Sequence, residues 1–321
     1  MTQLSTTRQF EHTSQKTLDL ALIGVPCDAG TDVRGASLGP EALRLCGLAT
    51  ALNDLGANIS DAGDIKGPDH EEAPKKSGCR NLNSIATWCQ LIQHQVYSAL
   101  QNKKLPVILG GDHSLSMGSI AAVARHCREA QKPLYVLWLD AHTDFNDPLS
   151  SPSGNMHGMP LSALCGKFME EKLGLGDEGP VVKPENIFLV GIRSVDSIEK
   201  LAVLDAGLNV FDMRLIDERG IARVIREILQ VVAEAGGHLH VSFDVDFLDP
   251  VLAPGVGTTV AGGVTYREAH HCMELIYESG LLGSLDMVEY NPLLDNQGMS
   301  ARIMIELAES LFGKQTIKVW T

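Results

Sequence analysis

The sequence has no uninterrupted run of 18 or more apolar residues, and this absence argues against a membrane-spanning helix. The first residues are polar and lack the apolar core of a secretory signal, so we expect residues 1–16 to be a flexible tail. Internal repeats, low-complexity tracts and an obvious interdomain linker are also missing. We therefore expect residues 17–321 to form a single domain.

Cysteine is sparse, and no pair has the Cys-x-x-Cys spacing of many zinc and redox sites. The seven cysteines are scattered along the chain, which fits reduced thiols in a cytoplasmic protein. Basic residues are also few, because 26 Lys and Arg face 40 Asp and Glu and give a formal net charge of −14. This charge argues against nucleic acids and anionic membranes as partners.

Short apolar runs alternate with helical patterns along the chain. The runs are rich in Val, Ile and Leu, as in strands buried on both faces, and cover residues 18–26, 105–111, 133–140, 186–192, 238–246 and 283–290. Helical spacing of apolar residues marks 82–100 and 221–232, and Thr265 with Glu268 forms a capping box before another helix. Residues 63–81 are typical of a surface loop. The alternation predicts a three-layer α/β/α domain with a mostly parallel central sheet.

Polar side chains follow five of these apolar runs, at the point where each run ends. They are His113 in GGDHS, Asp140, His142 and Asp144 in DAHTD, the segment 193–199 (RSVDSIE), Asp244 and Asp246 in SFDVD, and Glu289. Residues two apart in an extended chain point to the same side, so the side chains within DAHTD and within SFDVD should converge. The carboxyl ends of parallel strands meet at one edge of the sheet, where ligands bind. The sequence therefore predicts one site at this edge.

Two histidines and four aspartates are too many ligands for one catalytic metal ion with an open position. They suit two ions that share carboxylates, and the predicted ligands are His113, Asp140, His142, Asp144, Asp244 and Asp246. Oxygen-rich ligation with some imidazole favours two Mn²⁺ per chain, although Ni²⁺, Co²⁺, Fe²⁺ and Zn²⁺ stay open. Two such ions can lower the pKa of a bridging water enough to give hydroxide near neutral pH. SFDVD or His113 alone is a weak signal and DAHTD is a stronger one, and their joint placement at one edge carries the prediction.

Four segments resemble the signatures of the ureohydrolases, the arginase–agmatinase family: GGDHS, DAHTDFN, SGNMHG and SFDVDFLDP. The resemblance runs over about residues 18–313, and SPSGNMHG, RSVDSIE and VEYNP are most like the arginase branch. It implies that a metal-bridging hydroxide attacks the guanidinium carbon of L-arginine, which yields L-ornithine and urea. It also implies a homotrimer or a homohexamer.

The resemblance assigns roles residue by residue. The six predicted ligands match the family's metal ligands, with Asp144 also among the catalytic residues. His157 matches the proton shuttle, and Glu289 matches the carboxylate that meets the guanidinium. The remaining matches are Asn146 and Ser153 for the substrate α-carboxylate, Asp196 and Glu199 for the α-amino group, and Thr258 for the wall near the guanidinium.

Departures from the family pattern bear on the substrate. Phe145 and Asp147 flank Asn146 where the family often has an aliphatic residue and Thr, and Asp147 puts a negative charge beside the expected α-carboxylate site. Met159 and Thr259 also depart from the common residues. Another guanidine, such as agmatine or guanidinobutyrate, is therefore the main rival to L-arginine as substrate. A one-metal deacetylase and a catalytically silent metal protein are two further hypotheses for the function.

Overall fold

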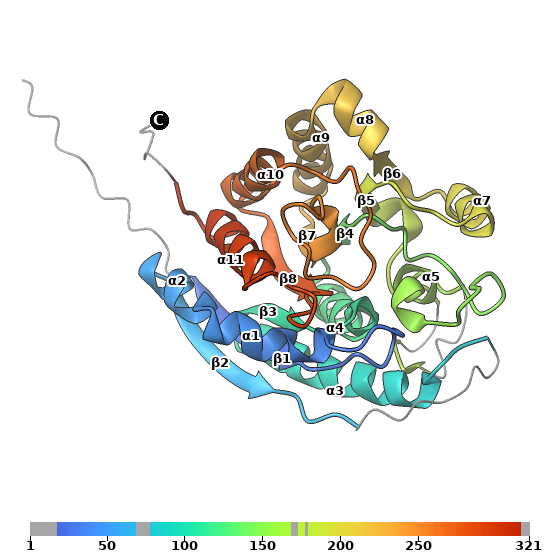
Figure 1. The fold of residues 1–321 in the computed structure, drawn as a ribbon, viewed down its shortest axis with the longest axis horizontal. Coiled ribbons are helices and arrows are strands. Elements are labelled where there is room, and N and C mark those ends of the chain that lie inside the picture. Colours follow the sequence, from blue (N-terminus) through green and yellow to red (C-terminus); the bar gives the residue numbers. More distant parts are fainter. Residues whose placement is uncertain (1–17, 69–77, 168–172, 177–178, 316–321) are drawn as a thin grey trace, which may run out of the picture.

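The computed structural model describes residues 18–68, 78–167, 173–176 and 179–315 (Figure 1). Within them, one eight-stranded sheet has the order β2-β1-β3-β8-β7-β4-β5-β6, with every pair parallel. The strands are β1 Asp19–Val25, β2 Asn58–Asp64, β3 Leu105–Gly110, β4 Leu134–Leu139, β5 Ile187–Ile192, β6 Asn209–Asp212, β7 His238–Asp244 and β8 Leu282–Val288. The predicted tail, residues 1–16, lies outside the described residues, and a single domain over 17–321 stays a prediction.

Apolar side chains on both faces of the sheet explain why its central strands have nearly continuous apolar sequences. In β4, Val136 and Trp138 pack into one core, whereas Leu137 and Leu139 pack into the other. Successive side chains of a strand point to opposite faces, so a strand covered on both sides needs apolar residues at every position. Two separate cores therefore hold the sheet between its helices.

Helices cover both faces and form the two outer layers (Figure 1). One layer consists of α1 Gly39–Leu45, α2 Leu48–Asp54, α8 Met213–Arg219, α9 Ile221–Glu234, α10 Tyr266–Ser279 and α11 Met299–Leu311. The other consists of α3 Leu82–Gln101, α4 Ser116–Glu129, α5 Pro160–Leu164 and α7 Ser197–Ala206. The predicted capping box is present, because Thr265 accepts the N–H of Glu268 and Glu268 accepts the N–H of Thr265. The predicted three-layer architecture with a parallel sheet is confirmed.

Two strands were not expected from the sequence, and both lie at the edges of the sheet. β2 (NISDAGD) and β6 (NVFD) contain no fully buried residue. An edge strand is covered less than a central one, so it lacks the continuous apolar run that marks the others. The loop predicted over 63–81 is wrong at its start, because β2 continues to Asp64; residues 69–77 of it lie outside the described residues.

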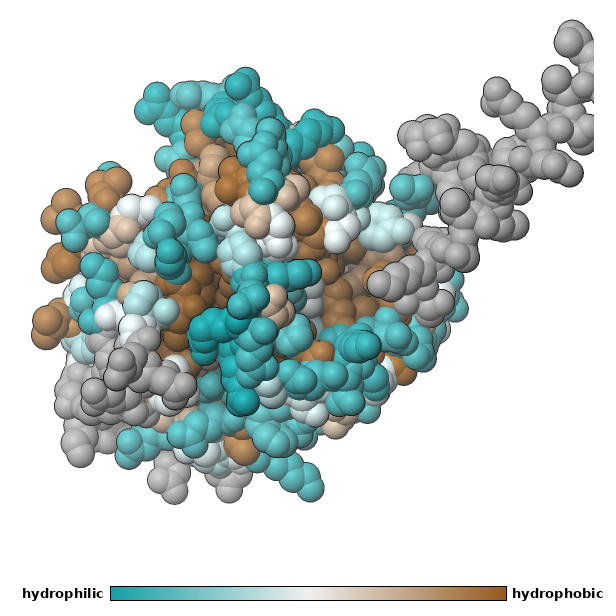
Figure 2. All heavy atoms as spheres, turned by 180° about the vertical axis from the view of Figure 1, so that it is seen from behind, coloured by the Kyte–Doolittle hydropathy of each residue, from teal (hydrophilic) through white to brown (hydrophobic). Residues whose placement is uncertain are grey.

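On the face that Figure 2 shows, polar and apolar side chains are interspersed at the surface. Ile198, Leu201 and Leu204 on α7 are exposed, and apolar side chains project at the left edge of Figure 2, on the side where α7 lies. Across the described ranges, no helix is both long and apolar enough to cross a bilayer.

Candidate active site

The predicted ligands meet at the carboxyl ends of three central strands, β3, β7 and β4, and β8 lies between β3 and β7. They are His113 just after β3, Asp140, His142 and Asp144 after β4, and Asp244 and Asp246 at the end of β7. Because each strand is buried and stops at the same edge, the chain delivers all six side chains to one place. Five of the six are buried, and His142 is partly exposed.

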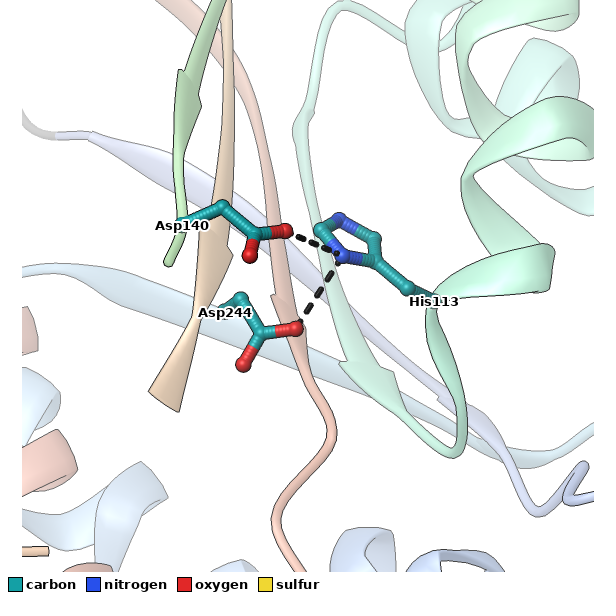
Figure 3. A group of neighbouring side chains, drawn as sticks. All are labelled: His113, Asp140 and Asp244. Carbon is teal, nitrogen blue, oxygen red and sulfur yellow. Dashed lines mark ion pairs between the residues drawn. The ribbon is translucent and has the colours of Figure 1, made fainter. Parts of the chain in front are cut away.

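His113 lies at the centre of the first group of side chains (Figure 3). Its Nδ1 is 3.0 Å from an oxygen of Asp140, 3.1 Å from one of Asp244 and 3.2 Å from one of Asp144. Three carboxylates from two segments of the chain thus face one ring nitrogen. The arrangement is that of donors around a common point rather than of one ion pair.

His142 lies at the centre of a second group, which shares Asp140 with the first. Its Nδ1 is 2.9 Å from an oxygen of Asp246 and 3.4 Å from the second oxygen of Asp140. The backbone fixes these carboxylates, since Asp246 accepts the N–H of Ala141 and Asp140 accepts the N–H of His142. A carboxylate with one oxygen in each group suits a ligand that bridges two ions.

Burial and mutual repulsion oppose the ionisation of three of the four carboxylates, whereas His113 and His142 outweigh burial and lower the pKa of Asp140. Burial and the nearby Asp140 raise the pKa of Asp144 to about 7, and the same two causes raise the pKa of Asp246. Burial and Asp246 raise the pKa of Asp244 well above its usual range. Although burial disfavours a charged imidazole, Asp140 and Asp246 raise the pKa of His142 to about 12. When all four carboxylates are ionised, they carry more negative charge than the two histidines can neutralise, so a bound cation would favour their ionised form.

Two polar atoms of the cluster support a bound cation directly. Within the described residues, Nδ1 of His113 and Oδ2 of Asp246 are buried and make no well-directed hydrogen bond. Buried polar atoms are almost always paired, so orphaned ones at the centre of an acidic cluster indicate a missing partner. Imidazole nitrogens and carboxylate oxygens are donors that divalent first-row metals accept. The residues present therefore fit a pair of such ions.

His157, which is partly exposed, pairs with buried Glu289 beside the carboxylate cluster. Nδ1 of His157 is 3.0 Å from Oε1 of Glu289, which also accepts the N–H of His113. Burial disfavours the charged imidazole, but Glu289 outweighs it and raises the pKa of His157 to about 9. At neutral pH His157 therefore carries a proton that it can donate.

The backbone is strained at two residues of the site. Asp144 has a φ of 45° and Glu289 a φ of 62°, in the left-handed region that side chains larger than glycine rarely adopt. Such conformations persist where the surrounding structure forces them, and they gather at functional sites. Glu289 directly follows β8, and Asp144 lies in the loop after β4, so both strained residues lie where the chain leaves a strand for the site.

One cavity of about 170 Å³ connects the predicted metal ligands with the predicted substrate contacts. Its lining includes His142, Asp144, Asp244, His157 and Glu289 together with Asn146, Ser153, Asp196, Glu199 and Thr258. All the residues predicted for substrate binding thus lie around the same space as the acidic cluster. Ser151, Asn155 and Ser194 line it as well; they lie within SPSGNMHG and RSVDSIE, but the resemblance assigned them no role.

Comparison with known proteins decides the family. The model of the Arginase family matches residues 18–313, nearly the whole chain. The chain belongs to the arginase family.

Individual arginases match over most of their length. The arginase of Agrobacterium fabrum is 41% identical over 98% of this chain and 96% of its own. The solved arginase of Bacillus caldovelox has a TM-score of 0.89 at 39% identity, with 94% of this chain and all of that chain covered. The Entamoeba histolytica arginase, solved in complex with L-ornithine, has a TM-score of 0.86 at 28% identity and equal coverage. Nearly the whole chain is thus similar to arginases in sequence and fold.

Trp138 and Ser242 support the cluster of this arginase-family protein, and the sequence motifs included neither as a site residue. The ring of Trp138 stacks on that of His113, with centroids 3.8 Å apart, and its Nε1 donates to Asp140. Ser242 lies 2.9 Å from Nε2 of His113, which leaves Nδ1 directed at the carboxylates. Each stands two residues before an aspartate of the cluster, so strand alternation was the signal that could have identified them.

Arg193 fixes the loop that carries Asp246. Its guanidinium donates to the backbone carbonyls of Gly191, Asp246, Phe247, Leu248 and Val260. Burial lowers the pKa of this arginine, although the nearby carboxylates favour its charge. By donating to these five backbone carbonyls, the Arg193 side chain connects the segment after β7 to β5.

Glu199 supports the substrate side of the cavity through the backbone. Its two oxygens accept the N–H groups of Phe145 and Asp196. Burial raises its pKa. Glu199 therefore holds together the loop after β4 and the start of α7, the two segments that carry Asn146 and Asp196.

Proposed function

We propose that this protein is a dinuclear-metal hydrolase that cleaves L-arginine to L-ornithine and urea. The observation that carries the proposal is one cavity whose lining includes residues of the acidic cluster and the His157–Glu289 pair together with Asn146, Ser153 and Asp196. Groups for a cation, a guanidinium and an amino-acid end thus face one small space. Membership of the arginase family supports the same reaction.

Two Mn²⁺ ions per chain are part of the proposal. One would be held by His113, Asp140, Asp144 and Asp244, and the other by Asp140, His142, Asp244 and Asp246. Bound there, the ions would lower the pKa of a water molecule and so supply hydroxide at neutral pH. The orphaned Nδ1 of His113 and the raised pKa values of the carboxylates support ligation by these residues.

Glu289 and His157 would act on the guanidinium end of the substrate. A carboxylate pairs with a guanidinium through charge-assisted hydrogen bonds, and buried Glu289 would hold and orient it. His157, whose pKa is raised to about 9, would donate its proton to the leaving amine nitrogen as the carbon–nitrogen bond breaks. Thr258 would form the adjacent wall.

Asn146, Ser153 and Asp196 would bind the amino-acid end. The amide and the hydroxyl can donate to the α-carboxylate, and the carboxylate of Asp196 can accept from the α-ammonium group. Since both oxygens of Glu199 already accept backbone N–H groups, we assign the α-amino contact to Asp196 and a supporting role to Glu199.

A cytoplasmic location and a homotrimer or homohexamer complete the proposal. Within the described residues no cysteine forms a disulfide bond, which supports a reducing compartment. The resemblance to the family supports the oligomer.

Urea release from a panel of guanidines after Mn²⁺ loading tests the function. We expect L-arginine to exceed agmatine and guanidinobutyrate in kcat/KM. The variants His142→Ala and Asp246→Ala should keep the fold and lose urea release, which a silent metal protein would not do. A preference for agmatine would contradict the substrate, and one metal ion per chain would favour a deacetylase.

A further inference from the structure

The loop after Asn146 forms a tight turn that Asp147 closes. The turn runs Asp147-Pro148-Leu149-Ser150, and Oδ1 of Asp147 accepts the N–H groups of both Leu149 and Ser150 at 2.8 Å. Asp at the first position and Pro at the second are the residues that this kind of turn favours, because Pro fixes φ and Asp bonds to the backbone ahead. The turn is therefore held by its own sequence.

The hydroxyl of Ser150 connects this turn to Asn146. It accepts the N–H of Asp147 at 2.8 Å and donates to Oδ1 of Asn146 at 2.9 Å. The other end of the amide, Nδ2 of Asn146, donates to Asp196 at 3.3 Å. A chain of hydrogen bonds thus runs from Asp147 to Asp196 along the rim of the cavity.

These contacts fix the orientation of the Asn146 amide, with its oxygen toward Ser150 and its nitrogen toward Asp196. With its oxygen occupied by Ser150, the amide has its NH₂ group available to Asp196 and to a ligand. The reversed amide would place its oxygen against the carboxylate of Asp196, and two acceptors repel each other. Ser150 and Asp196 therefore favour the same orientation, with a donor toward the ligand.

Asp147 itself does not line the cavity, unlike its neighbours Asn146 and Ser151. Its charge is directed at two backbone N–H groups, and its carbonyl accepts the N–H of Ser151. The negative charge that the sequence places next to the expected α-carboxylate site is thus turned away from it.

We propose that Asp147 and Ser150 are positioning residues that make the cavity selective for guanidines with an α-carboxylate, by holding the Asn146 amide with its NH₂ group toward the ligand. The inference rests on the proposed function, because it needs Asn146 to meet the α-carboxylate. Neither residue touches the substrate, and both act through Asn146.

Ser150→Ala in the full-length, Mn²⁺-loaded protein removes the connection. We expect the KM for L-arginine and the Kd for L-ornithine to rise about 10-fold, as for one lost hydrogen bond to a charged group, with kcat changed less than about 2-fold. The inhibition constant of agmatine, which lacks the carboxylate, should stay unchanged. Ser150→Thr keeps the hydroxyl and should restore tight binding of L-ornithine.

Two substitutions at Asp147 separate position from charge. Asp147→Asn keeps an oxygen that can accept both N–H groups, so it should behave like the wild type, whereas Asp147→Ala should resemble Ser150→Ala. Tighter L-arginine binding in Asp147→Asn would mean that the charge acts on the substrate directly and would overturn the inference. Ser279→Ala, which removes a serine bonded to a helix carbonyl far along the chain, is the control.

Calorimetry with L-ornithine distinguishes failure of the inference from failure of the function. If the wild type binds L-ornithine and Ser150→Ala binds it equally well, or if agmatine weakens as much as L-ornithine, the inference is wrong. If the wild type itself binds no L-ornithine and releases no urea from L-arginine, the proposed function is wrong instead.

Discussion

The wall of the cavity has two parts that are built in different ways. We call them the acidic end, formed by the carboxylate cluster, and the loop end, formed by the segment that carries Asn146. The acidic end consists of strand termini, and its side chains bond across the sheet, as His113 does to Asp140, Asp144 and Asp244. The other end consists of a loop that bonds mainly to itself, as the turn from Asp147 to Ser150 shows. One end is fixed by the core of the protein and the other by local turn chemistry.

This difference indicates that the two ends have different functions. A strand end that is backed by a packed core can hold buried like charges in place against their mutual repulsion. A metal centre requires ligands that are held in this way. A turn held by its own hydrogen bonds can change in sequence without disturbing that core. We therefore expect substitutions at the acidic end to affect metal binding and kcat, and substitutions in the loop to affect KM and substrate choice.

The largest effect should come from the carboxylate that both groups share. Asp140→Ala removes an oxygen from each group, so we expect more loss of urea release than the ~100-fold that follows loss of a supporting residue. Metal content after dialysis, measured by atomic absorption, should fall in parallel. The exposed Asp54→Ala is the control, and retention of two ions per chain by Asp140→Ala would show that the two ends are not divided as described.

The proton donor should give the next largest effect. His157→Asn removes the group whose pKa is raised to about 9, and we expect kcat to fall about 100-fold or more while KM changes little. Steady-state urea release measures both constants. His94→Asn, an exposed histidine on α3, should leave both unchanged. An increase in KM alone would place His157 with the loop end of the cavity.

Trp138→Phe should give a smaller effect that is confined to the acidic end. The phenyl ring can still pack against His113, but the bond from Nε1 to Asp140 is lost, so we expect Mn²⁺ to bind about 10-fold more weakly. Titration of the metal-stripped protein with Mn²⁺ measures this. Trp88→Phe changes a buried tryptophan in α3 and is the matched control. Equal affinity in both variants would contradict a positioning role for Trp138.

The acidic end was more predictable from sequence than the loop end for a physical reason. An apolar run that stops at DAHTD or SFDVD is a local signal, and parallel topology brings such ends together without further information. Asp147 resembled these aspartates in the sequence, but its role depends on where its oxygens point in a turn. Position along the chain does not distinguish a carboxylate aimed at the cluster from one aimed at two N–H groups.

The alternation of side chains along a strand could also have identified supporting residues such as Trp138. Its apolar character made it look like an ordinary core residue, and only its stacking on His113 reveals a second task. The edge strands β2 and β6 were missed because partial exposure removes the apolar pattern. Predictions from sequence were therefore best where a buried apolar run stops abruptly at a polar residue of the site.

The smallest expected effect is a pH-dependent change in the thermal stability of the protein, which we attribute to the carboxylates of the acidic end. Burial and Asp140 raise the pKa of Asp144 to about 7, above its usual 3.8, so without metal the folded protein holds extra protons between these values. Stability of the metal-free protein should therefore decrease as pH rises from about 4 to 7. Mn²⁺ binds the ionised carboxylates, so its stabilisation should increase over the same range.

The gap in Tm between Mn²⁺-loaded and metal-stripped protein should thus widen from pH 5 to pH 7 by on the order of a few degrees, measured by scanning calorimetry. Ser150→Ala should show the same gap as the wild type, because the Ser150 hydroxyl bonds to Asn146 and Asp147 and to none of the carboxylates of the cluster. A gap that is constant with pH would contradict the charge assignment of the cluster. A gap that changes in Ser150→Ala would show that the two ends of the cavity are energetically coupled.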